Sequence, residues 1–329
     1  MKRITALFVS LALLCLTAGC GSSNDLTPVT LSEVAHSIFY APQYAAIELG
    51  YFEEEGIDLT LVNAGGADKV MTSLISGDAH IGFMGSEASI YVYAEGAEDY
   101  VINFAQLTQR AGNFLVSREP MDSFTWADLA GTTVLGGRKG GMPQMVFEYI
   151  LKKHGLDPAT DLNMDQSISF GLTAAAFTGG DADFTVEFEP YATLLELEGS
   201  GYVVASLGEA SGYVPYTAYS AQKSYLESHP EIIQGFTNAI QKGLDYVNTH
   251  SSQEIAAVIA PQFPETEEST IAVIVERYLA QDTWKGDTIF EESSFSLLQN
   301  ILKEAGELPM PVPYEDLVTT EYSVAALAK

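Results

Sequence analysis

Short apolar segments alternate with longer segments of helical periodicity through most of the chain, and this alternation restricts the fold more than any other feature. Strands that alternate with helices build sheets whose strands are joined by crossover helices. The sequence therefore predicts an α/β protein. Strands are expected at residues 29–35, 58–62, 80–84, 100–107, 132–135, 183–188 and 202–207. Helices are expected at residues 42–50, 67–75, 87–95, 143–154, 169–178 and 190–198.

A weak internal repeat divides this alternating region in two. A Gly-hydrophobic-Asp turn leads from an expected helix into a strand at 56–58 and again at 155–157, roughly 100 residues later, which is the size of a small domain. Gly-Asp turns at 76–80 and 179–183 follow in the same order. Such turns are common, so chance is the alternative, but the matching order predicts two related lobes.

The chain beyond residue 223 is mostly helical. Ser251 and Glu254 have the spacing of a capping box and predict a helix start. This tail is too short for a third domain with its own sheet, so we expect it to pack on the first lobe. The other tail helices are expected at residues 231–248, 267–280 and 291–305.

The N-terminus has the features of a bacterial lipoprotein signal. Lys2 and Arg3 precede an apolar run at 4–16 that is too short to span a bilayer. Small residues then lead to Cys20, which is expected to carry lipid, and a polar segment follows at 21–25. An ordinary signal peptide with a chance cysteine is the alternative. We therefore expect a chain that is lipid-anchored on the extracytoplasmic face of the cell membrane.

The acidity of the chain excludes several classes of partner. The formal net charge is -29 at pH 7, whereas nucleic acid and anionic lipid surfaces attract basic faces. Neither is an expected partner of the folded part. The 2 cysteines are Cys15 and Cys20, at the signal, so no disulfide is expected and stability must come from an apolar core.

The sequence carries no recognisable catalytic motif. The 5 histidines are scattered without metal-ligand spacing, and only His36 lies in an expected cleft loop. A Gly-x-Ser-x-Gly nucleophile turn is absent. We therefore expect no enzyme activity, no metal and no cofactor.

A series of short motifs follows the first expected strand. They are an aromatic loop at 37–44, a helix and acidic turn at 46–58, a Gly-Asp turn at 76–82, a Trp-containing segment at 126–134 and an acid-Pro-aromatic turn at 189–191. Together they resemble the periplasmic-type binding proteins for sulfonates, nitrate and thiamine pyrimidines. The likeness covers about residues 28–250, and it specifies the family rather than the ligand.

The resemblance implies a two-lobed periplasmic-binding-protein type II fold, with two doubly wound sheets joined by a two-crossing hinge. The crossings are expected near 114–118 and 213–219. The implied partners of this monomer are a small solute held between the lobes and an ABC permease with its ATPase. The expected divisions are a signal peptide at 1–19, a tether at 20–27, lobe one at 28–114 and 218–329, and lobe two at 115–217.

Ligands of open α/β sheets lie beyond the carboxyl ends of the strands, so the loops there hold the candidate site. In lobe one these loops offer aromatic rings and backbone N–H groups at helix starts, although the same residues could serve as core packing, tight turns or a helix cap. The lobe-one candidates are Phe39, Tyr40, Tyr44, Gly65, Gly66, Gly85 and Ser86.

In lobe two, a Gly-rich loop with the cation Arg138 lies between a strand and a helix. Gly140 and Gly141 could present backbone donors there, whereas a nucleotide-binding Walker pattern is absent. Glu187 and Glu189 share one face of a strand and could accept a ligand N–H or cation, or else form a solvated turn.

Rings and carboxylates favour an aromatic or heterocyclic solute, resembling a vitamin precursor. A small sulfonate, nitrate or organic carboxylate is the alternative, with Arg110, Arg118 or Arg138 as its clamp. A remote alternative is an enzyme of the pyrimidine-precursor type. The cysteine-rich motif of that eukaryotic branch is missing from this chain.

Overall fold

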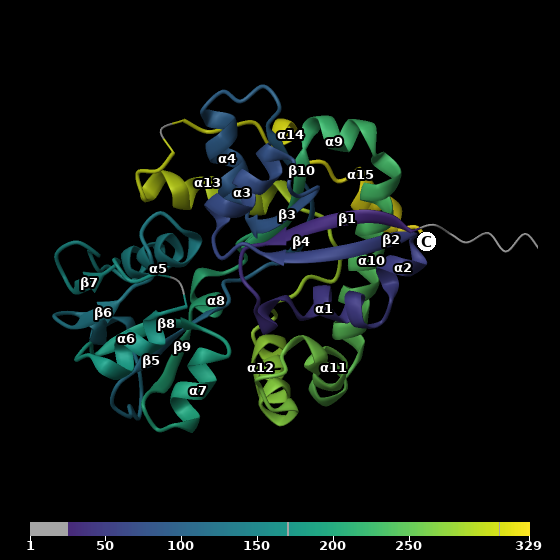
Figure 1. The fold of residues 1–329 in the computed structure, drawn as a ribbon. Coiled ribbons are helices and arrows are strands. Elements are labelled where there is room, and N and C mark those ends of the chain that lie inside the picture. Colours follow the sequence, from purple (N-terminus) through teal and green to yellow (C-terminus); the bar gives the residue numbers. More distant parts are fainter. Residues whose placement is uncertain (1–25, 170, 309) are drawn as a thin grey trace, which may run out of the picture.

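Two five-stranded sheets form the cores of two lobes (Figure 1). This computed structural model describes residues 26–169, 171–308 and 310–329. The first sheet has the order β2-β1-β3-β10-β4, and the second has the order β7-β6-β8-β5-β9. The strands of the first sheet are β1 (Thr27–Glu33), β2 (Ile57–Asn63), β3 (Ile81–Gly85), β4 (Val101–Thr108) and β10 (Thr217–Gln222). Those of the second are β5 (Asn113–Ser117), β6 (Thr133–Leu135), β7 (Asn163–Asp165), β8 (Phe184–Phe188) and β9 (Tyr202–Ser206).

Both sheets follow one topology. In each, the second strand in the order, β1 or β6, pairs in parallel with both of its neighbours. A strand from the opposite part of the chain then pairs antiparallel with the central strand: β10 with β3 in the first sheet, and β5 with β8 in the second. The predicted α/β class with two doubly wound sheets is confirmed. The shared strand order also fits the internal repeat of Gly-Asp turns.

Helices cover both sheets and continue into the tail. The helices of lobe one are η1 (Ile38–Tyr40), α1 (Ala41–Glu48), α2 (Tyr51–Glu54), α3 (Ala67–Ser76) and α4 (Glu87–Ala94). Those of lobe two are η2 (Trp126–Leu129), α5 (Met142–Lys153), α6 (Thr173–Gly179), α7 (Tyr191–Leu197) and α8 (Leu207–Ser211). The tail forms α9 (Lys223–Ser228), α10 (Pro230–Thr249), α11 (Ser252–Ile259), η3 (Ala260–Gln262), α12 (Glu268–Ala280), α13 (Glu292–Glu304), α14 (Tyr314–Leu317) and α15 (Glu321–Leu327).

The first of the two crossings between the sheets lies before its expected place, whereas the second overlaps the expected 213–219. The chain leaves the first sheet after Thr108 and joins the second at Asn113; it returns between Ser206 and Thr217. The first expected crossing, at 114–118, is therefore wrong. These residues form most of β5, a buried strand paired with β8 and β9, because an apolar run this short fits a sheet interior better than a linker.

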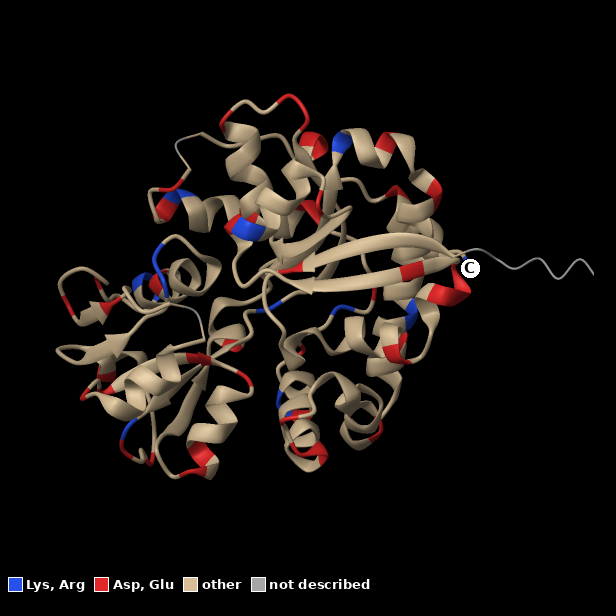
Figure 2. Ribbon diagram, viewed as in Figure 1, with Lys and Arg blue, Asp and Glu red and all other residues tan. Residues whose placement is uncertain are grey.

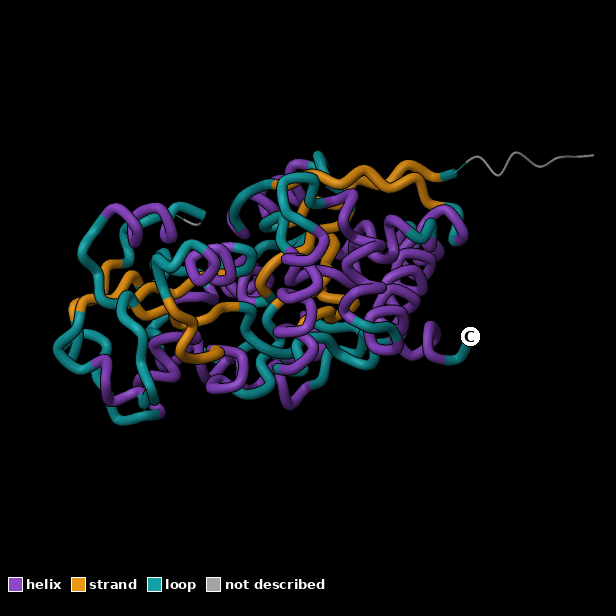
Figure 3. Tube along the Cα trace, turned by 90° about the horizontal axis from the view of Figure 1, so that it is seen from below, coloured by secondary structure: helices purple, strands orange, loops and turns teal. Residues whose placement is uncertain are grey.

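The tail packs mainly on lobe one but also reaches lobe two. Helix α10 packs against α1, and α15 packs against α10 and β4, as expected. Helix α13 also contacts α5 of lobe two, so the expectation that the tail meets only lobe one is incomplete. Seen from below, the strands of the two lobes lie in separate groups, with helices packed beside each group (Figure 3).

Acidic residues are spread over both lobes, with few Lys and Arg among them (Figure 2). This distribution agrees with the net charge of -29. None of the helices in the described part of the chain combines the length and the hydropathy that a membrane crossing requires.

A glycine permits close packing of α10 on α1. A Cβ on Gly243 would lie 2.2 Å from the carbonyl oxygen of Pro42 and 3.1 Å from Cβ of Ala46. Gly243→Ala is therefore expected to lower the free energy of unfolding by about 1–3 kcal/mol, because the two backbones must separate. Chemical denaturation measures this loss.

The control for this substitution is Gly286→Ala, since a Cβ there meets no described atom within 4 Å. Equal stability of the Gly243 variant and this control would contradict the packing argument.

Candidate ligand-binding site

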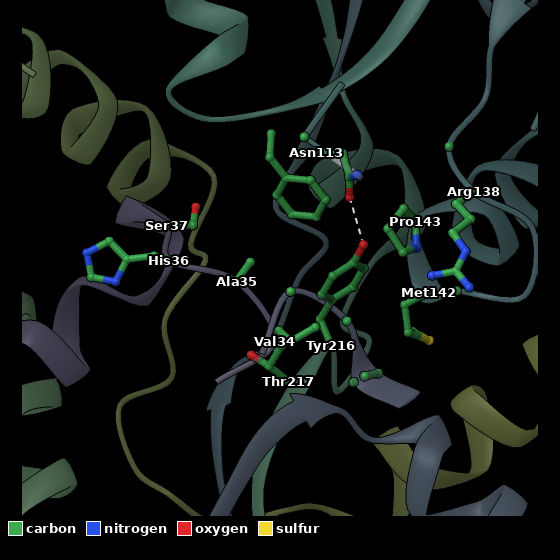
Figure 4. Close-up of a pocket in the computed structure, with 18 of the residues that line it drawn as sticks. Val34, Ala35, His36, Ser37, Asn113, Arg138, Met142, Pro143, Tyr216 and Thr217 are labelled. Carbon is green, nitrogen blue, oxygen red and sulfur yellow. Dashed lines mark hydrogen bonds between the residues drawn. The ribbon is translucent and has the colours of Figure 1, made fainter. Parts of the chain in front are cut away.

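A cavity of about 730 Å³ lies between the two lobes (Figure 4). Its size is within the range of pockets that hold small organic molecules. Lobe one contributes the loops after β1, β2 and β3, and lobe two contributes the loops after β6 and β8. A tail segment at 262–266, after η3, completes the wall. The cavity therefore lies at the carboxyl ends of the strands, where ligands of such sheets bind.

The structure brings most of the candidate site residues together at this cavity. The candidates that line it are Tyr40, Gly65, Gly66, Gly85, Arg138, Gly140, Gly141, Glu187 and Glu189.

Three candidates lie behind the cavity wall instead. Phe39 is buried among the rings of Tyr40, Phe188, Tyr216 and Tyr278. Tyr40, Phe188 and Tyr216 form the side of this cluster that faces the cavity, so Phe39 supports the site without lining it.

The other two are held by hydrogen bonds. The hydroxyl of Tyr44 donates to Glu33 Oε2 at 2.9 Å. The hydroxyl of Ser86 donates to the carbonyl of Pro215 at 2.6 Å, a contact between loops rather than the helix cap that the sequence allowed.

The glycine loops offer fewer free backbone donors than the sequence suggested. The N–H of Gly65 donates to Asn63 Oδ1 at 3.0 Å, and the N–H of Gly140 donates to Gln144 Oε1 at 2.9 Å. Gly85 has a different role: a Cβ there would lie 2.1 Å from Oε2 of Glu87. The missing side chain makes room for this carboxylate.

The two carboxylates predicted for the site are already bonded within the protein. Glu187 accepts hydrogen bonds from Thr173 at 2.8 Å and from Thr185 at 2.6 Å, and burial raises its pKa to about 7. Glu189 accepts from Arg277 at 2.7 Å and from Thr193. Burial raises the pKa of Glu189, and the guanidinium opposes part of that rise.

Glu87 was not predicted as a site residue, yet it lines the cavity. Its side chain is buried, and Oε2 has no hydrogen-bond partner among the described residues. Burial raises its pKa to about 7, and the backbone N–H groups of Glu87 itself and of Met142 oppose this only in part. An acid in the first turn of a helix ordinarily indicates a favourable interaction with the helix dipole, so no local pattern singled out Glu87.

Asn113 was also missed, because the sequence placed it next to an expected hinge. It is buried and lines the cavity. The hydroxyl of Tyr216 donates to its Oδ1 at 2.9 Å (Figure 4), whereas Nδ2 has no partner in the part of the chain that the structure describes.

His36 lines the cavity but both of its ring nitrogens are engaged. Nδ1 lies 2.8 Å from Glu33 Oε1, and Nε2 lies 2.9 Å from the carbonyl oxygen of Gln262. The hydrogen bond with Glu33 raises the pKa of His36. The residue joins the loop after β1 to the tail, which is a structural role.

The three candidate arginine clamps are in different situations. Arg110 donates to the carbonyl of Gly208 and stacks on Tyr213. Arg118 is likewise bound to backbone carbonyls of lobe two, away from the cavity. Arg138 is exposed at the cavity and its guanidinium has no partner among the described residues (Figure 4).

Direct contacts hold the lobes together around the cavity. The hydroxyl of Ser37 in lobe one donates to the carbonyl of Glu189 in lobe two at 3.1 Å. Arg277 of α12 binds both Glu189 and Glu196, with the second contact at 2.6 Å. In the described ranges, no group of three or more His, Cys, Asp or Glu residues could hold a metal ion.

Comparisons with known proteins agree with this architecture. The chain is 46% identical over 312 residues to YtlA of Bacillus subtilis (strain 168), covering 95% of this chain and 93% of that protein. It is 23% identical over 295 residues to the formylaminopyrimidine-binding protein of Halalkalibacterium halodurans, covering 84% and 87%. The structure of the alkanesulfonate-binding protein SsuA from Xanthomonas axonopodis pv. citri, bound to MOPS, matches with a TM-score of 0.72 at 17% identity, covering 90% and 99%.

The family model described as NMT1/THI5 like matches residues 38–254, which span most of both lobes. The fold is the type II fold of periplasmic binding proteins. Because the family model also matches most of both lobes, the chain belongs to the NMT1/THI5-like family.

Proposed function

We propose that the chain is the extracytoplasmic substrate-binding subunit of an ABC importer and captures a small aromatic or heterocyclic solute. The observation that carries this proposal is the cavity, because both lobes line it and ligand can be enclosed between them. Membership of the NMT1/THI5-like family supports the role. YtlA is named as a binding protein without a stated ligand.

The composition of the wall favours a flat solute with N–H groups. The rings of Tyr40, Tyr216 and Phe188 line the cavity, and rings stack on planar heterocycles. Glu87 adds a buried carboxylate with an unpaired oxygen. A related protein binds formylaminopyrimidine, a molecule of this kind.

A small sulfonate, nitrate or organic carboxylate is the second candidate. The free guanidinium of Arg138 at the cavity favours it, since such groups bind oxyanions well. The carboxylates at the cavity oppose it, because they would repel the anion.

We propose further that the chain acts as a monomer, delivers its solute to a permease with its ATPase, and is anchored by lipid on Cys20. That cysteine and the predicted signal peptide lie outside the described residues, so the sequence pattern alone supports the anchor. Capture would proceed by bending at the connections 109–112 and 207–216.

A solute panel tests the proposed function. Aminopyrimidines, alkanesulfonates, nitrate and aromatic carboxylates are added to the protein, and thermal unfolding is followed. A true ligand is expected to stabilise the native state by about 2.7 kcal/mol at 100 times its dissociation constant. Native mass spectrometry of the purified protein identifies any solute that it retains.

A matched pair of variants on α4 controls the panel. Ala88 lines the cavity, so Ala88→Phe is expected to remove the ligand-induced shift. Ala94 is exposed on the same helix, so Ala94→Phe is expected to keep it. If no solute shifts the wild type and none is retained, the proposed function is wrong.

A further inference from the structure

Two residues at the cavity each have an unpaired polar atom, of which one is a hydrogen-bond acceptor and the other is a donor. Within the described residues, buried side-chain atoms without a partner belong to Ser32, Glu87, Gln106, Arg110, Asn113 and Thr288. Of these residues, Glu87 and Asn113 line the cavity. Native proteins satisfy almost all buried polar groups, so an exception in a binding site indicates a group that a ligand satisfies.

The carboxylate of Glu87 is held in place by its surroundings. It lies against the Cα of Gly85, where a Cβ would come within 2.1 Å of Oε2 and 2.6 Å of Oε1. Tyr40, Tyr91 and Tyr216 are close enough to interact with it electrostatically. The side chain therefore has a defined position from which it can accept a hydrogen bond.

The amide of Asn113 is also held in one orientation, by a hydrogen bond from Tyr216. Tyr216 donates to Oδ1 at 2.9 Å, which leaves Nδ2 as the free donor. Tyr216 is thus bonded to Asn113 and is within electrostatic range of Glu87.

We propose that Glu87 and Asn113 are the specificity-determining pair of this site: Glu87 accepts an N–H from the solute, and Asn113 donates to an acceptor atom on it. This inference rests on the proposed function and narrows its substrate class. The solute is a planar heterocycle that carries an amino group or ring N–H together with a ring nitrogen or carbonyl. An anion without an N–H group would leave the acceptor on Glu87 unsatisfied.

The other carboxylates at the cavity do not compete for this role. Both oxygens of Glu187 accept from threonine hydroxyls, and both oxygens of Glu189 accept from Thr193 or Arg277. A solute N–H would have to displace these partners.

The test uses two ligands that differ in one group, 4-amino-2-methylpyrimidine and 2,4-dimethylpyrimidine. The second replaces the amino group with a methyl group of similar size. Isothermal titration calorimetry is expected to show that the wild type binds the amino compound about 10- to 100-fold more tightly, the size of one hydrogen bond to a charged group.

Three variants identify the residues responsible. Glu87→Met removes the acceptor and is expected to abolish the preference for the amino compound, whereas Glu87→Gln keeps an acceptor oxygen and is expected to restore part of it. Glu95→Gln is the control, because Glu95 is exposed at the end of the same helix. Asn113→Asp keeps the acceptor for Tyr216 but loses the free donor, so it is expected to weaken binding about tenfold or more.

The outcomes separate the inference from the proposed function. If the wild type binds both pyrimidines equally, or if Glu87→Met keeps the preference, the inference is overturned while the receptor role stands. The inference is also overturned if only sulfonates or nitrate bind. If neither these compounds nor the wider panel binds, the proposed function falls as well.

Discussion

Replacing Arg277 with methionine is expected to lower the free energy of unfolding by about 3–5 kcal/mol at pH 8, because it leaves a buried carboxylate without its counter-charge. The side chain of Glu189 is 0% exposed, and its Oε1 lies 2.7 Å from the guanidinium of Arg277. Thr193 is the other residue bonded to this carboxylate. Its neutral groups cannot replace a positive charge.

The loss is expected to be smaller at pH 5 than at pH 8. Burial already raises the pKa of Glu189, and removing Arg277 raises it further. At pH 5 the variant can therefore protonate Glu189 and avoid burying an unpaired charge. Chemical denaturation at the two pH values measures the difference.

The double variant Arg277→Met/Glu189→Gln is expected to recover much of the stability, because the buried charge is then absent. Glu196→Gln is the control, since Glu196 is 33% exposed at its side chain and its loss costs little. A loss that is equal at pH 5 and pH 8, and that the double variant does not recover, would falsify this electrostatic account.

Arg277 also matters for the relation between the lobes. It lies on α12 in the tail, while Glu189 and Glu196 belong to lobe two. Together with the contact between Ser37 and Glu189, it joins the lobes directly. The free energy of lobe closure therefore has a component that comes from contacts within the protein.

Local patterns in the sequence predicted most elements of this fold. The alternation of apolar runs and helical segments placed α3, α4 and α5 within a few residues of their true bounds. The strand β7 was missed because Asn163–Asp165 is short and has no apolar pattern. The strand β5 was taken for a connection, since nothing local says which sheet a run such as 114–116 joins.

The candidate site was predictable only at the level of loops. Topology places the loops after β1, β2, β3, β6 and β8 at one cavity, so most residues chosen there line it. Which carboxylate stays free was not predictable. It depends on Thr173 and Thr185 satisfying Glu187, and on Arg277 reaching Glu189 across 88 positions of sequence. Such long-range pairings leave no local signal, and Glu87 was overlooked for that reason.

The free energy of unfolding of the solute-free protein is expected to fall as the pH rises from about 5 to 8. Burial raises the pKa of Glu87 and of Glu187 to about 7 from an ordinary value of 4.5. In this range the unfolded chain releases both protons before the folded protein does, so ionisation favours unfolding. Each carboxyl contributes a loss of at most about 3 kcal/mol. His36, whose pKa is raised by its hydrogen bond with Glu33, acts in the same direction.

Urea denaturation across this pH range measures the fall. Glu87→Gln is expected to remove the share of Glu87, because the amide does not titrate, while Glu187 and His36 keep theirs. Glu95→Gln, at an exposed position, is expected to leave the slope unchanged. A stability that is constant or rises between pH 5 and 8 would show that water or a neighbouring group stabilises the ionised carboxylates.

A solute that donates an N–H to Glu87 favours the ionised form of this carboxyl group. Saturating solute should therefore reduce the pH dependence of the wild type and not that of Glu87→Gln, which links the stability of the folded chain to the chemistry of its ligand.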